Sequence, residues 1–113
     1  MATLATQVIT PTGLAPTFAA AAGGGDKVTP GDSRFVEIKN VGGSPCVVTI
    51  DDPNSVTPVG AQSFNPDLSV SVPATTGDRM IGPLGARFAN QADGLVAITY
   101  SQVTSVTIGS FGL

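Results

Sequence analysis

The stretch Arg34-Phe35-Val36-Glu37-Ile38-Lys39-Asn40 decides the fold of this chain. Val36 and Ile38 occupy alternate positions, and charged residues stand between and after them. A period of two places apolar side chains on one face of a strand and polar side chains on the other. We therefore expect a strand over residues 34–40 with one face in the core and one in solvent.

Similar short runs lie on both sides of this stretch. Alternation recurs in Cys46-Val47-Val48-Thr49-Ile50 and in Ser69-Val70-Ser71-Val72, and shorter β-type runs occupy residues 6–10 and 79–81. The alanine run within residues 17–22 has good helix propensity, but it is short and ends in glycines. We expect a strand or an extended segment there.

The last thirty residues contain no proline and hold the two strongest strand candidates, residues 95–101 and 105–111. The link 102–104 is short enough for a β-hairpin. Because no proline blocks pairing on either side, we expect two central strands joined by this hairpin.

Composition supports an all-β chain. The 113 residues include 14 Gly and 9 Pro, and only 12% are charged, against about 25% in an average protein. Long helices need the Leu, Glu, Lys and Arg that are scarce here. We expect an extended N-terminal arm over residues 1–12 and one domain over residues 13–113. That domain is predicted to be a small β-sandwich or jelly-roll-like barrel of about 7–9 short strands.

Charge limits the partners. The net charge is -3, and the five basic residues are scattered along the chain. Nucleic-acid binding relies on clustered Lys and Arg that neutralise phosphates, so we expect no nucleic-acid partner. No apolar run reaches the roughly 18 residues of a membrane span, so we expect no membrane partner either.

Residues for catalysis are scarce. The chain has no His and a single Cys46, which excludes a Ser-His-Asp triad and a Cys/His zinc site. Most Asp residues lie beside Gly or Pro, as turn residues do. The run 23–27 lacks the Gly-Lys-Ser/Thr ending of a phosphate loop, and the calcium-like oxygens of residues 51–55 lack EF-hand spacing. We expect no enzyme, no cofactor and no metal site, and a buried Cys46.

The N-terminal arm is the candidate contact segment. Residues 1–12 have no obvious local core to join, and an extended segment of this kind can add a strand to a neighbouring sheet. A frayed terminus is the alternative interpretation. The candidate contact residues, for a capsid subunit or a neighbouring copy, are Thr3, Leu4, Thr6, Val8 and Thr10.

Several segments resemble a known family. They are Met1-Ala2-Thr3-Leu4-Ala5-Thr6-Gln7, Thr12-Gly13-Leu14-Ala15-Pro16-Thr17, Gly24-Gly25-Asp26-Lys27, Val36-Glu37-Ile38-Lys39-Asn40, Arg79-Met80-Ile81-Gly82-Pro83-Leu84 and Asp93-Gly94-Leu95-Val96-Ala97-Ile98-Thr99-Tyr100-Ser101. In these segments the chain is similar to small head decoration or minor capsid proteins of tailed bacteriophages. Proteins of this type are encoded beside the major capsid gene in phages of actinobacteria.

The resemblance implies a virion component present in many copies, with no cofactor and no enzymatic activity. On this basis we expect a decoration protein that binds the outer capsid lattice and stabilises it. The expected partners are the major capsid protein and other copies of the chain, as a homotrimer. The alternatives are a virion-displayed module for a sugar or host surface, and a head-to-tail or tail subunit.

Overall fold

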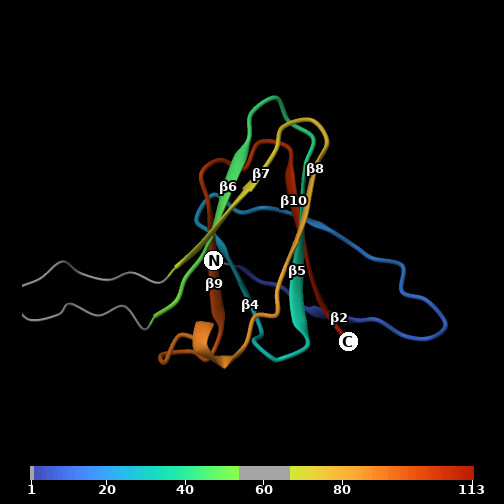
Figure 1. The fold of residues 1–113 in the computed structure, drawn as a ribbon, viewed down its shortest axis with the longest axis vertical. Coiled ribbons are helices and arrows are strands. Elements are labelled where there is room, and N and C mark those ends of the chain that lie inside the picture. Colours follow the sequence, from blue (N-terminus) through green and yellow to red (C-terminus); the bar gives the residue numbers. More distant parts are fainter. Residues whose placement is uncertain (1, 54–66) are drawn as a thin grey trace, which may run out of the picture.

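The computed structural model describes residues 2–53 and 67–113, which fold into a sandwich of two β-sheets (Figure 1). The first sheet has the order β1-β4-β9-β6-β7, with β1 (Ala2–Thr3), β4 (Asp26–Val28), β9 (Val96–Tyr100), β6 (Cys46–Ile50) and β7 (Leu68–Val72). The second has the order β2-β10-β5-β8, with β2 (Thr6–Val8), β10 (Val106–Gly112), β5 (Arg34–Asn40) and β8 (Gly77–Ile81), and β3 (Ala19–Ala20) also pairs with β10. A single 3₁₀ turn, η1 (Ala86–Phe88), is the only helical element among the described residues. The expected all-β sandwich is confirmed.

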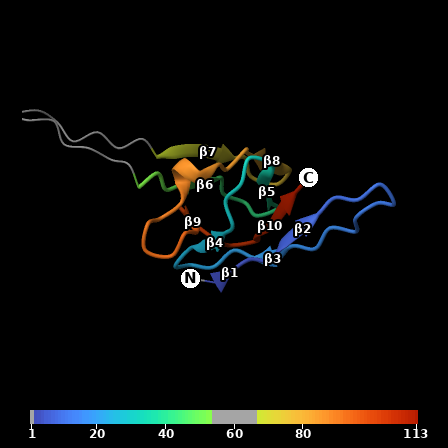
Figure 2. The same cartoon turned by 90° about the horizontal axis from the view of Figure 1, so that it is seen from below.

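The core lies between the two sheets, which form two layers in Figure 2. Val36 and Ile38 of β5 are fully buried, as their alternation predicts, and belong to the same core cluster as buried Ile98 of the first sheet. The remaining members of the core cluster are Ala21, Val28, Cys46, Val48, Ile50, Val72, Ile81, Leu84, Phe88, Val96, Val106 and Ile108. Short β-branched side chains fill a thin sandwich of this kind efficiently.

The predicted hairpin between residues 95–101 and 105–111 is wrong. Both segments form central strands, but β9 pairs with β4 and β6 in the first sheet, whereas β10 pairs with β5, β2 and β3 in the second. The link closes through a bond from the Val106 N–H to the Val103 carbonyl (3.2 Å), and Ser105 takes a positive φ of 57°. The chain therefore crosses from one layer to the other at this point.

The N-terminal residues join both sheets. β1 pairs with β4 in parallel, and β2 pairs with β10 in parallel. Between them Leu4 donates its N–H to the Lys27 carbonyl (2.8 Å) and packs its side chain against the core. Residues 17–22 contain β3, which confirms the extended conformation expected there.

Each sheet ends in a strand with a single neighbour. Among the described residues, β7 closes the first sheet and pairs only with β6, and β8 closes the second and pairs only with β5. Figure 2 shows both strands along the same side of the sandwich. The free backbone margins of the two sheets are therefore close together on that side.

Candidate interaction surface

The structure distributes the five candidate contact residues over three places. Thr3 lies exposed in β1 of the first sheet, and Leu4 packs against the core. Thr6 pairs with Ser110 in the second sheet, and its hydroxyl is buried with no hydrogen-bond partner among the described residues. Val8 at the end of β2 is 50% exposed, and Thr10 lies beyond it in an exposed turn. Thr3, Val8 and Thr10 can thus reach a partner directly.

The segment between β2 and β3 projects from the sandwich as a long loop, drawn in blue in both views (Figures 1 and 2). Gln7 fastens its base. The side-chain amide of Gln7 donates to the Thr17 carbonyl (2.8 Å), and its oxygen accepts from the Thr17 N–H (2.9 Å) and hydroxyl (3.1 Å). The amide thereby replaces the ladder bonds that a paired strand would supply.

Three aromatic rings pack on the outer face of the second sheet, at the root of this loop. Phe111 stacks on Phe35 with ring centroids 5.6 Å apart, and Phe18 meets Phe111 edge-on at 5.8 Å. The Lys39 ammonium lies 4.5 Å from the Phe18 centroid, within cation–π range. This aromatic cluster leaves Phe111 only 4% exposed, although its side chain points away from the core.

Exposed apolar side chains continue from the aromatic cluster around the same end of the sandwich. Ile9 is 42% exposed, Met80 68% and Leu113 76%. Two surface depressions, of about 420 and 140 Å³, share Phe35 and Met80 in their walls; Leu113 lines the larger, and Ile9 with Leu14 the smaller. We call the patch formed by Ile9, Leu14, Phe35, Met80 and Leu113 the apolar surface.

Two carboxyl groups lie beside the apolar surface. Glu37 in β5 pairs with Met80, and Asp78 in β8 pairs with Lys39 one step along the ladder. Burial raises the pKa of Glu37, and hydrogen bonding and repulsion from Asp78 raise this pKa further, while Lys39 opposes the shift. The raised pKa means that Glu37 takes up its proton, and loses its negative charge, at a higher pH than an ordinary glutamate does.

A second group of acidic side chains consists of Asp51, Asp52 and Asp67. The Asp67 carboxylate accepts the Asp52 N–H (2.8 Å), and Arg87 approaches the buried Asp52 carboxylate (3.6 Å). Burial and the neighbouring Asp67 raise the pKa of Asp51. Within residues 2–53 and 67–113, no three His, Cys, Asp or Glu side chains are placed to hold a metal ion. Asn54 and Ser55 of the calcium-like run lie outside the described residues.

Buried polar groups in the first sheet are satisfied by one another. The Tyr100 hydroxyl donates to the buried Asp26 carboxylate (2.7 Å), which also accepts the Ala22 N–H (3.2 Å). Burial, and then Asp26, raise the pKa of Tyr100. Cys46 is buried, as predicted, and directs its thiol to the Gln102 carbonyl (3.2 Å).

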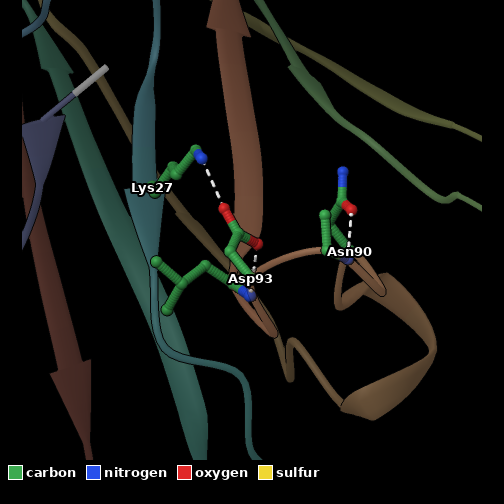
Figure 3. A network of polar contacts seen from close by, with 5 residues as sticks. Lys27, Asn90 and Asp93 are labelled. Atoms are coloured by element: carbon green, nitrogen blue, oxygen red, sulfur yellow. Dashed lines mark hydrogen bonds and ion pairs between the residues drawn. The ribbon is translucent and has the colours of Figure 1, made fainter.

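The turn before β9 shows how an Asp beside glycine serves structure (Figure 3). One oxygen of Asp93 pairs with the Lys27 ammonium, and the other accepts the Leu95 N–H (3.0 Å). Asn90 accepts the Ala92 N–H (2.9 Å) in the same turn. Lys27 of the phosphate-loop-like run is therefore tied to a carboxylate, and a strand rather than a helix follows Gly25.

Comparisons with known proteins found no match for the chain. No family model, no curated protein and no solved structure matches it. No helix among the described residues combines the length and apolarity needed to cross a bilayer.

Sequence reasoning missed both the aromatic cluster and the three hydrogen bonds from Gln7 to Thr17, which we call the glutamine clamp. Phe18, Phe35 and Phe111 are far apart in the sequence, and their contact depends on the pairing of β10 with β5. One indication was present: Phe35 and Phe111 sit at positions whose alternation points out of the core. An outward aromatic residue on each of two strands is a pattern typical of a second, external cluster.

Proposed function

We propose that this chain is a structural virion protein that binds the outer surface of a phage capsid lattice and stabilises it. The observation that carries the proposal is the apolar surface beside the projecting loop. Exposed apolar side chains that gather in one patch are typical of protein-binding sites. A contact of this kind gains free energy from apolar burial and needs little opposite charge on the partner.

Repetition would make a modest contact effective. Each copy of the chain would bury a small patch against the major capsid protein and neighbouring copies. A ligand that binds the assembled lattice better than free subunits stabilises the lattice by mass action. Many weak contacts on a closed shell add up to a large effect through multivalency.

The test compares two sets of surface changes on capsids that lack the protein. We expect Met80→Ser with Leu113→Ser to weaken binding about tenfold or more, since each loses roughly 1 kcal/mol of apolar burial. Val41→Ser is the matched control, because Val41 is 72% exposed at the opposite end of β5. Decorated particles should release their genome at a higher temperature than bare particles.

Two results would contradict the proposal. One is equal thermal stability of bare and decorated particles, and the other is full binding by the double variant. A quantitative gel of virions separates the alternatives, because a decoration protein is abundant whereas a head-to-tail subunit is present in few copies. Glycan binding by the isolated chain would favour the host-surface alternative.

A further inference from the structure

The free margin of β7 is formed by the backbone of two serines. In β6 the Val47 carbonyl accepts the Ser101 N–H (2.9 Å), and the Asp51 N–H donates to the Ala97 carbonyl (3.0 Å). Alternate residues of a strand bond to opposite sides. The even-numbered residues of β6 therefore bond to β7, where their ladder partners are Leu68, Val70 and Val72.

The residues between these partners face the other way. Ser69 and Ser71 direct their N–H and C=O groups away from β6, toward the margin of the sheet. Both serines are exposed, and β7 has no second strand partner among the described residues. Unpaired backbone groups in a row form a template for another strand.

This margin lacks the features that normally prevent strand addition. β7 reads Leu68-Ser69-Val70-Ser71-Val72, with no charge, proline or bulge. The margin of the other sheet differs, because β8 carries the exposed charges Asp78 and Arg79. Proteins place charges on edge strands to block association, and β7 alone of these two edges has none.

The sequence of β7 is complementary to itself in an antiparallel register. With a two-fold axis at Val70, Ser69 of one copy lies opposite Ser71 of the other, and Leu68 lies opposite Val72. The outward N–H and C=O groups of both serines then pair in each copy. Val70 meets Val70 as a non-hydrogen-bonded pair, in which side chains approach most closely. Pro73, which has no N–H, falls opposite Asp67, where the ladder ends.

We propose that β7 is a self-association edge, to which a second copy of this chain adds its own β7 antiparallel. The first sheets of the two copies would continue into one another across the two-fold axis. The occupant is a second copy because the register centred on Val70 sets hydroxyl opposite hydroxyl and apolar side chain opposite apolar side chain over all five residues of β7. This contact is independent of the apolar surface, and it forms a pair rather than the homotrimer predicted from the resemblance.

The mass of the full chain in solution tests the proposal without capsids. Sedimentation equilibrium should show a shift from 11.3 kDa toward twice that mass as concentration rises to the millimolar range. Ser69→Lys with Ser71→Lys places Lys opposite Lys at two positions of the pair. We expect these substitutions to raise the dissociation constant about tenfold or more, and salt should recover part of the loss.

A matched variant separates charge repulsion from the mere loss of serine. Ser69→Lys with Ser71→Glu changes the same two positions but places Lys opposite Glu in both, so it should still pair. Both variants keep the folded monomer, because the two side chains are exposed and their backbone groups do not bond to β6. Circular dichroism and thermal unfolding verify this.

Three outcomes would overturn the proposal. The wild-type chain could remain monomeric at millimolar concentration, which would leave the edge to another partner or to none. Its mass could rise but be insensitive to Ser69→Lys with Ser71→Lys, which would place the contact elsewhere. The Lys/Glu variant could fail to pair while remaining folded. Capsid binding plays no part in these measurements, so they stand apart from the proposed function.

Discussion

At the scale of single residues, Gln7 has a structural role that the neighbouring sequence does not predict. Its amide holds Thr17 through three hydrogen bonds and so closes the base of the projecting loop. Gln7→Ala removes all three. We expect it to lower the free energy of unfolding by about 1 kcal/mol, because water replaces part of an exposed set of bonds. Urea unfolding measures the loss, and subtilisin should cut the loop faster.

Two other variants test whether the hydrogen bonds between Gln7 and Thr17 cause the loss of stability. Gln7→Glu keeps an acceptor for the Thr17 N–H but replaces the donor with a carboxylate that faces the Thr17 carbonyl, so it should also destabilise the chain. Gln91→Ala is the matched control, since Gln91 is exposed in the turn before β9. Equal proteolysis of the loop in all four proteins would show that the clamp does not hold it.

At the scale of elements, the pairing of β5 with β8 makes stability depend on pH. Glu37 has a raised pKa because of burial and then Asp78. A carboxyl that binds its proton more tightly when folded adds stability as pH falls through its folded pKa toward the unfolded value, about 4.3. The free energy of unfolding contributed by Glu37 should therefore rise on acidification from neutral pH.

Asp78→Asn tests this pH dependence. It removes repulsion from Glu37, so stability at neutral pH should rise and the gain on acidification should shrink, while the part caused by burial remains. Urea unfolding across the pH range measures both. Asp32→Asn is the control, because Asp32 is exposed in the turn before β5. An unchanged slope in Asp78→Asn would show that the two carboxyl groups do not interact.

The elements also show what sequence can and cannot specify. Alternation located β5, β6 and β7 because each strand has one face in the core. It did not locate the partners of β9 and β10. Both strands point Val and Ile inward, and an inward face looks the same whether the next strand lies beside it or across the core. The backbone of Ser105, with φ at 57°, directs the chain from one sheet to the other. A serine in the sequence does not predict a positive φ.

The candidate surface was only partly predictable for the same reason. Val8 and Thr10 are exposed and so accessible to a partner, but Leu4 packs against the core of its own chain. The five-residue prediction treated the N-terminal arm as one unit. Two short parallel pairings, to β4 and to β10, divide it between the layers, and parallel pairing over such distances leaves no local pattern in the sequence.

At the scale of the whole molecule, Cys46 reports on the opening of the sandwich. Its side chain is 0% exposed in β6, between two paired strands, so a thiol reagent reaches it only when the sheets separate. Labelling should be slow in native buffer and should accelerate with urea in parallel with global unfolding. Ser44→Cys supplies an internal control, because this exposed position precedes β6 by two residues and should react at once. Fast labelling of Cys46 at a urea-independent rate would mean that β6 opens locally. The two layers would then be held together less cooperatively than their single shared core implies.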